Sequence, residues 1–142
     1  AMNSKAPRGI RNNNPLNIRI GNRWKGEVTI PTDKQFEQFT HMKWGVRAGF
    51  IILRNYIQRY KLRTIPEIIS RWAPNNENNT TKYIEAVCKY SGFDKSYQFD
   101  WWSRTDMYAL FHAMCKVENG TDIEHSDVTQ GYGLAIGENT VI

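Results

Sequence analysis

The segment from Lys43 to Tyr60 carries the strongest helical periodicity in the chain. Its apolar residues recur at intervals of three and four positions, at Val46, Phe50, Leu53, Ile57 and Tyr60. This spacing puts the apolar side chains on one face of a helix. Because an apolar helical face must be buried against other elements, we predict that this segment is the central helix of the fold.

Other segments also have helical patterns. Thr64 and Glu67 form a capping box that opens a short helix, which Pro74 ends. We predict a second helix from Thr80 or Thr81 to Tyr90 and a third from Ser103 to Gly120, and we interpret the run 75–79 as a loop. The range 127–136 is interrupted by glycines and predicts a short helix or a turn.

Two shorter segments, Ile18–Ile30 and Gln35–Phe39, alternate in part between apolar and polar residues. Turn residues at 21–22 and 31–33 separate them, a pattern that favours an antiparallel hairpin. We therefore predict an α+β fold that is mainly α, with a helical lobe and a small antiparallel β-hairpin region.

The length of 142 residues and a hydrophobic content of 40% fit one domain with a core of its own. We predict a single monomeric domain over 9–142, preceded by a mobile segment at 1–8 in which Ala1 is consistent with a tag remnant. The chain has no apolar run long enough to span a membrane and no leader pattern, so the route of export is not predicted.

Cysteines and histidines give no metal-binding pattern. Cys88 and Cys115 lie on apolar helical faces, so we interpret them as buried thiols, with a disulfide between them as the alternative. The three histidines, His41, His112 and His125, are scattered. We predict no metal and no cofactor.

The net charge of +5 favours a polyanionic partner, which leaves nucleic acid and an anionic bacterial cell wall as candidates. The basic residues are dispersed, and no nucleic-acid-binding motif is present. Nucleic acid is therefore the less favoured partner.

Glu118 is the first candidate for a catalytic residue. It ends the predicted helix that stops at Gly120, on the side of the apolar residues Met114 and Cys115. Partial burial would raise its pKa, and a carboxyl group that keeps its proton near neutrality can donate it to a glycosidic oxygen. The alternative interpretation is a structural or solvated glutamate.

Several motifs resemble the lysozyme-like superfamily, especially the lytic transglycosylases. The Gly-Val-Arg-Ala-Gly run at 45–49 looks like the Gly-x-x-Ala-Gly element of that family, and the Tyr-Ile-Glu-Ala-Val run at 83–87 looks like its Tyr-x-x-x-Val helix. The helix that carries the glutamate comes last in this chain, whereas it comes first in the family. The resemblance therefore implies a circular permutation.

Shorter motifs resemble small phage-type virion and cell-wall-degrading proteins. They are the runs 8–19, 71–74 and 118–120. The run 14–18, followed by Trp24 and Gly26, is similar to peptidoglycan glucosaminidases, in which such a region supplies a second acidic residue. Glu27 would be its counterpart here.

These resemblances imply that the protein cleaves peptidoglycan glycan strands at the bacterial cell wall or in the periplasm, as a muramidase or a lytic transglycosylase. Glu118 would be the general acid, and the second role would fall to Glu27, to Glu37 or to the N-acetyl group of the substrate. The predicted substrate-binding residues are Tyr83, Asn14, Asn17 and Trp24. The alternative functions are an inactive module that binds cell wall or builds a virion and, less favoured, a nucleic-acid-binding domain.

Overall fold

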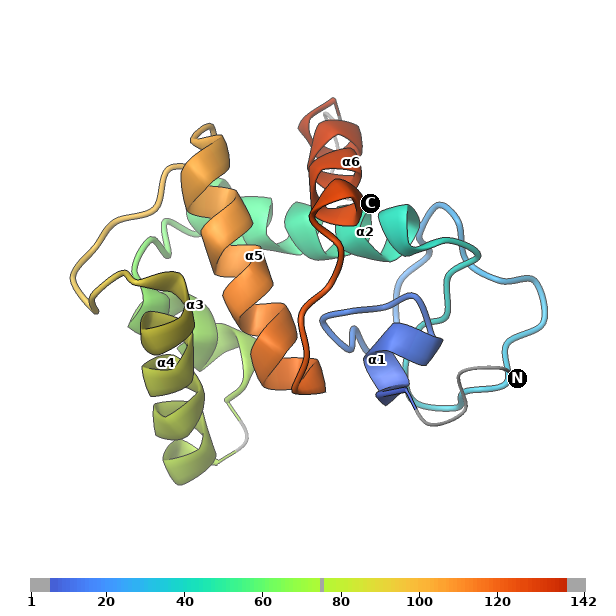
Figure 1. The fold of residues 1–142 in the computed structure, drawn as a ribbon, viewed down its shortest axis with the longest axis horizontal. Coiled ribbons are helices and arrows are strands. Elements are labelled where there is room, and N and C mark those ends of the chain that lie inside the picture. The colour runs from blue at the N-terminus through green and yellow to red at the C-terminus, as the bar shows by residue number, and fades with distance from the viewer. Residues whose placement is uncertain (1–5, 75, 138–142) are drawn as a thin grey trace.

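The computed structural model describes residues 6–74 and 76–137 (Figure 1). Their regular structure is almost entirely helical. In chain order the elements are α1 (Arg8–Arg11), α2 (Met42–Arg54), the π-helical turn η1 (Asn55–Arg59), α3 (Ile65–Trp72), α4 (Glu77–Ser91), α5 (Arg104–Asn119) and α6 (His125–Ile136). The prediction of a mainly helical fold is confirmed.

The ends of the helices follow local chemistry. Thr64 and Glu67 form the predicted capping box at the start of α3, and the Ser103 side chain accepts a hydrogen bond from the Asp106 amide at the start of α5. Gly120 ends α5 with a φ of 71°, a left-handed conformation that suits glycine. The predicted loop at 75–79 is wrong in part, because α4 already begins at Glu77.

The central helix is α2. It packs so closely against α5 and α6 that two glycines at these contacts have no room for a side chain. A Cβ atom on Gly49 would lie 2.8 Å from Phe111 of α5, and one on Gly131 of α6 would lie 2.3 Å from Val46. In Figure 1, α5 and α6 both cross α2. The predicted helix to Tyr60 is confirmed, with η1 as its last turn.

Aromatic rings join these helices into one core. Phe50 of α2 packs against Phe111 with ring centroids 4.4 Å apart and against Tyr132 of α6 at 5.2 Å. The same cluster of buried apolar residues extends from Leu16 to Ala135. Because burial of apolar area is the main source of stability, this shared core fixes the relative positions of the helices.

The predicted β-hairpin is wrong. Between residues 12 and 41 the structure has two isolated bridges, Arg19 with Phe36 and Glu27 with Phe39, and no strand ladder. The two segments exchange a few backbone hydrogen bonds, and side chains satisfy other backbone groups: Asn14 bonds the amide and carbonyl of Ile18, and Asp33 accepts from the amides of residues 35 and 36. Asparagine and aspartate compete with regular pairing in this way.

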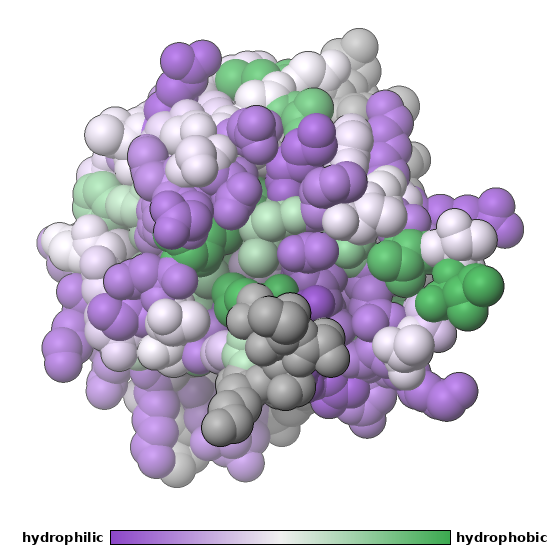
Figure 2. Space-filling view, turned by 45° about the vertical axis from the view of Figure 1, so that its right-hand side comes forward, coloured by the Kyte–Doolittle hydropathy of each residue, from purple (hydrophilic) through white to green (hydrophobic). Residues whose placement is uncertain are grey.

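The predicted mobile segment falls partly outside the described residues, at 1–5. Within the described part, Arg8 forms a two-pronged ion pair with Asp33, with both nitrogen–oxygen distances at 2.7 Å. The face in Figure 2 is mostly hydrophilic, with apolar side chains in small separate groups. No helix of residues 6–74 or 76–137 has the length and hydropathy needed to cross a bilayer.

Candidate active site

Glu118 lies in the last turn of α5, half-buried, and its carboxylate receives three hydrogen bonds. The Asn17 amide donates to Oε1 at 2.9 Å. The Tyr83 hydroxyl and the Trp72 indole donate to Oε2 at 2.9 and 3.3 Å. These donors come from the loop after α1, from α4 and from α3, so three separate parts of the fold converge on one carboxylate.

The loop that carries Asn17 is tied to α5. Asn119, next to Glu118, donates from its amide to the Pro15 carbonyl at 2.7 Å and to the Cys115 carbonyl at 3.0 Å. Asn17 itself adopts a left-handed φ of 52°, which asparagine tolerates better than most residues. The neighbour of Glu118 therefore fixes the loop that supplies one of the donors to Glu118.

Gly9 leaves room for this arrangement. The Oδ1 atoms of Asn17 and Asn119 are both buried and have no hydrogen-bond partner among the described residues. A Cβ atom on Gly9 would lie 2.5 Å from the Oδ1 of Asn119 and 2.9 Å from that of Asn17. Any side chain at position 9 would thus press directly on the residues that position the Glu118 carboxylate.

Tyr83 keeps its proton across the physiological range. Burial raises the pKa of Tyr83 well above its ordinary value, and the charge of Glu118 raises it further. A protonated phenol can both donate and accept a hydrogen bond. Tyr83 can therefore stay bonded to Glu118 before and after the carboxyl group gives up a proton.

A groove of about 360 Å³ opens beside Glu118. Its lining residues come from the loop after α1, from α2, η1 and α5, from the end of α3, and from Phe36. Its lining residues are Leu16, Asn17, Ile18, Arg19, Phe36, Ile52, Tyr56, Trp72, Ala73 and Glu118. Glu118 is the one carboxylate among these lining residues, and three aromatic rings, those of Phe36, Tyr56 and Trp72, line the groove with it.

Glu27 and Glu37 form a separate acidic pair. They line a neighbouring cavity of about 300 Å³, and Phe36 lines both this cavity and the Glu118 groove. Glu37 is only 7% exposed. Burial, followed by the charge of Glu27 and a hydrogen bond with it, raises the pKa of Glu37 to about 7. Glu27 also accepts a hydrogen bond from the Trp24 amide at 3.1 Å.

The structure therefore brings together Glu118, Tyr83 and Asn17, but it does not bring the other predicted site residues into the same groove. Trp24 is 6% exposed and lies in the core, and Asn14 is fully buried, where its amide bonds the carbonyls of Ile18 and Glu37. Glu27 lines the neighbouring cavity.

Sequence reasoning did not select Trp72, Tyr56 or Arg19 as site residues. Trp72 belongs to the Arg-Trp-Ala-Pro run at 71–74, which already carried part of the resemblance to phage-type proteins, so a signal for it was present. Arg19 ends the run 8–19, which carried part of the same resemblance, whereas Tyr56 had no such signal. Their place in the groove follows from how α2 and the loop after α1 pack together.

Cys88 and Cys115 are both free thiols. Cys115 is buried next to Asn119, and burial raises its pKa to about 12. Over the described ranges, the histidine, cysteine and acidic side chains form no group of three that could hold a metal ion.

Comparison with known proteins shows a relative among phage proteins. The chain is 38% identical over 135 residues to protein P5 of Pseudoalteromonas phage PM2, a match that covers 91% of this chain and 82% of that protein. No family model matches the chain. The resemblance to the lysozyme-like superfamily and the circular permutation that it implies therefore stay predictions.

Proposed function

The chain belongs to the family of protein P5 of Pseudoalteromonas phage PM2, and from that premise we propose that it cuts the glycan strands of bacterial peptidoglycan, with Glu118 as the general acid. A phage must cross or dissolve the cell wall of its host. The observation that carries the proposal is the Glu118 carboxylate, held by three donors inside an aromatic-walled groove.

Proton transfer is the first step. The bond between the anomeric carbon and the leaving oxygen breaks as the Glu118 proton moves to that oxygen. The reaction leaves Glu118 as a carboxylate, and Asn17, Trp72 and Tyr83 each direct a hydrogen bond to it. Because these donors are already in place, the negative charge that develops on Glu118 is stabilised without reorganisation of the site.

The positive charge that develops on the sugar needs a second group. Since the acidic residues Glu27 and Glu37 line a different cavity, we assign this role to the N-acetyl group of the substrate, whose carbonyl oxygen forms a bond with the anomeric carbon. Glu118, now ionised, then accepts a proton from the group that opens this intermediate. That group is water in hydrolysis and the sugar's own 6-hydroxyl in the formation of an anhydro product.

The groove walls suit a sugar. Tyr56 and Trp72 meet edge to face with ring centroids 6.3 Å apart, and Phe36 lies among the lining residues of the same groove. Aromatic faces of this kind pack against the apolar faces of sugar rings. The Arg71 guanidinium lies over the Tyr56 ring at 5.5 Å, which supports the wall from outside.

The test uses insoluble peptidoglycan, incubated with the wild-type protein, with Glu118→Gln and with Glu85→Gln, in which an exposed glutamate of α4 is changed as a control. Muropeptides released into solution are identified by mass spectrometry. The proposal predicts release by the wild type and by Glu85→Gln and none above background by Glu118→Gln. Products lighter by one water molecule identify anhydro formation.

Three results would contradict the proposal. Equal release by Glu118→Gln would move catalysis to another residue. Binding to peptidoglycan without release by any form would identify an inactive wall-binding or virion module. Salt-sensitive binding to DNA that is unchanged in Glu118→Gln, without release of muropeptides, would favour a nucleic-acid-binding domain.

A further inference from the structure

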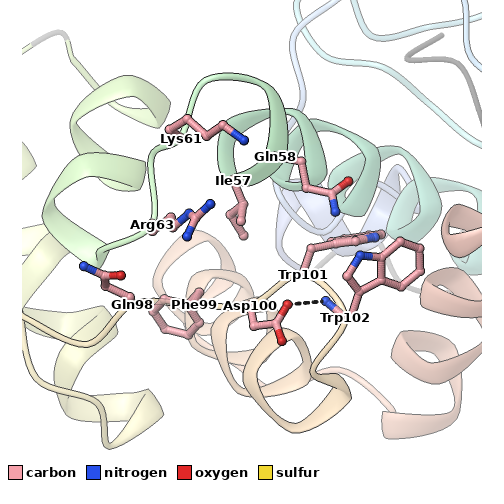
Figure 3. Close-up of a pocket in the computed structure, with 9 residues that line it drawn as sticks. All are labelled: Ile57, Gln58, Lys61, Arg63, Gln98, Phe99, Asp100, Trp101 and Trp102. Carbon is pink, nitrogen blue, oxygen red and sulfur yellow. Dashed lines mark hydrogen bonds between the residues drawn. The ribbon is translucent and has the colours of Figure 1, made fainter.

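A second pocket lies at the opposite end of α5 from Glu118. It has a volume of about 380 Å³ and is drawn in Figure 3. Trp102 precedes the first turn of α5, and Glu118 lies in the last. At 1.5 Å per residue, about 20 Å of helix separates them. The pocket is therefore distinct from the groove beside Glu118.

The pocket has an apolar base and a polar rim. Three buried side chains, Ile57, Phe99 and Trp101, line it, and each is at most 3% exposed. Above them stand longer polar side chains and one aromatic ring, those of Gln58, Lys61, Arg63, Gln98, Asp100 and Trp102. Trp102 is 56% exposed, which is unusual for a tryptophan because this residue type is highly buried on average.

Backbone contacts hold the pocket in shape. The Phe99 amide donates to the Arg63 carbonyl at 2.8 Å, which joins the two segments that form its walls. The Asp100 side chain accepts from the Trp102 amide at 3.0 Å, a contact drawn as a dashed line in Figure 3. Lys61 adopts a left-handed φ of 59°, a conformation that is uncommon for lysine and is often found at functional positions.

Two cations of the rim stand across the pocket from two aromatic rings, Trp102 of the rim and Trp101 of the base. Figure 3 shows Lys61 and Arg63 on one side of the pocket and Trp101 and Trp102 on the other. Neither the Lys61 ammonium nor the Arg63 guanidinium has an ion-pair or hydrogen-bond partner within the described part of the chain. Both charges are thus available to an anionic ligand.

These features match one ligand chemistry. A broad indole surface packs against a sugar ring, and the small apolar base has room for an acyl methyl group. The two cations match carboxylates a few ångströms from the sugar. An N-acetylated sugar that carries an acidic peptide has all three of these parts, and it is the repeating unit of peptidoglycan.

We propose that this pocket is a second binding site for peptidoglycan, which takes an N-acetyl sugar on Trp102 and the carboxylates of its attached peptide on Lys61 and Arg63. The inference rests on the proposed function for its choice of polymer. The pocket would hold the protein on insoluble peptidoglycan while the Glu118 groove acts on another part of the same polymer.

A single-stranded nucleic acid is the competing ligand, since it also combines flat rings with negative charge. Two observations favour peptidoglycan. Nucleic-acid grooves follow the backbone with a longer row of cations, whereas this rim has two. The base made by Ile57 and Phe99 is apolar, which suits an acyl group better than a phosphate.

The experiment uses the full chain as Glu118→Gln, so that the probe is not cleaved. The probe is a disaccharide of N-acetylglucosamine and N-acetylmuramic acid bearing its acidic tetrapeptide. Binding is followed by NMR through the indole N–H signal of Trp102, which Trp102→Phe identifies. Lys61→Gln with Arg63→Gln is compared with Lys82→Gln and Lys89→Gln, which remove the same charge from exposed positions of α4.

We expect the Trp102 signal to shift on titration. We expect Lys61→Gln with Arg63→Gln to weaken binding about tenfold, whereas the α4 control pair leaves it unchanged. The same disaccharide without its peptide should also bind about tenfold more weakly than the probe. No shift of the Trp102 signal, an equal effect of the two variant pairs, or tighter binding of a single-stranded oligonucleotide would overturn the site.

Cleavage by the protein with intact Glu118 is scored separately. Cleavage without a response of Trp102 would overturn this second site alone. A response of Trp102 without cleavage would overturn the proposed function and support the pocket as a binding site.

Discussion

The Tyr83 hydroxyl donates a 2.9 Å hydrogen bond to Oε2 of Glu118, across 35 positions of sequence and between two packed helices, α4 and α5. The same oxygen accepts from Trp72 of α3. Because α3 packs on α4 and α4 packs on α5, the two helical donors and the carboxylate belong to one packed group of helices. The loop that carries Asn17 approaches from the other side.

Removal of the Tyr83 hydroxyl tests its share of charge stabilisation. Tyr83→Phe keeps the ring and its packing but loses one hydrogen bond to a charged group, so we expect kcat to fall about 10- to 100-fold with little change in KM. Steady-state cleavage of a soluble glycan oligomer measures both. Tyr90→Phe, on an exposed part of α4, is the control. A kcat equal to that of the wild type would show that the hydroxyl has no catalytic role.

Trp72 has two proposed roles, as a hydrogen-bond donor to Glu118 and as an aromatic wall of the groove. Two different substitutions separate these roles. Trp72→Phe loses the indole donor to Glu118 and keeps an aromatic wall, so we expect kcat to fall about tenfold while KM stays near its wild-type value. Trp72→Ala loses the wall as well, and KM should then rise in addition. The same kinetic assay applies. If the two variants had identical KM values, the ring would not contribute to sugar binding.

Substitution of Gly9 tests whether Asn17 and Asn119 position Glu118. In Gly9→Ala the new methyl group would press on the Oδ1 atoms of Asn17 and Asn119, so we expect a loss of about 1–3 kcal/mol of stability and at least a tenfold loss of kcat. Thermal unfolding and cleavage rates are measured together. Gly133→Ala, on an exposed helical position with no atom near the added carbon, should be neutral or stabilising by about 0.5–1 kcal/mol.

The outcome that counts against this role of Gly9 is a variant with normal activity. Loss of stability with unchanged kcat would show that the loop after α1 can shift without moving Asn17 away from Glu118.

The buried Glu37, paired with the half-buried Glu27, predicts how stability depends on pH. The pKa of Glu37 is raised from the ordinary 4.5 to about 7, so between these values the folded protein retains a proton that the unfolded chain releases. The free energy of unfolding should therefore fall as the pH rises from 4.5 to 7. Glu37→Gln, which cannot ionise, should match the wild type near pH 4.5 and exceed it by about 1–3 kcal/mol at pH 8.

Urea unfolding at a series of pH values measures this difference. A difference that stays constant from pH 4.5 to 8 would mean that Glu37 does not titrate in this window. Glu124→Gln, at an exposed glutamate before α6, controls for the change in net charge.

Much of the helical framework was accessible from sequence because its signals are local. The capping box at Thr64, the serine cap at Ser103 and the left-handed stop at Gly120 each depend on residues within one turn. The hairpin prediction failed for the opposite reason. Between residues 12 and 41 the two segments exchange only a few backbone hydrogen bonds, and Asn14 and Asp33 bond further backbone groups from positions that an alternating pattern does not reveal.

In the candidate site, too, local features could be predicted from sequence and contacts between distant elements could not. Glu118 and Tyr83 were recognised through motifs in their own helices, and their contact required the packing of α4 on α5. Trp24 and not Trp72 was selected from sequence as a binding residue, and this choice failed because the exposure of a tryptophan is decided by distant elements. Trp24 lies in the core, and Trp72 reaches Glu118.

Delivery of a proton from Glu118 to a glycosidic oxygen is tested by the initial rate of muropeptide release. The rate of Glu118→Gln is compared with that of the wild type at equal amounts of protein bound to peptidoglycan. Gln keeps the size and the polar character of the side chain and cannot donate that proton. We predict normal binding and a rate lower by about 10²–10⁴-fold. A rate within twofold of the wild type at equal binding would show that Glu118 is not the general acid.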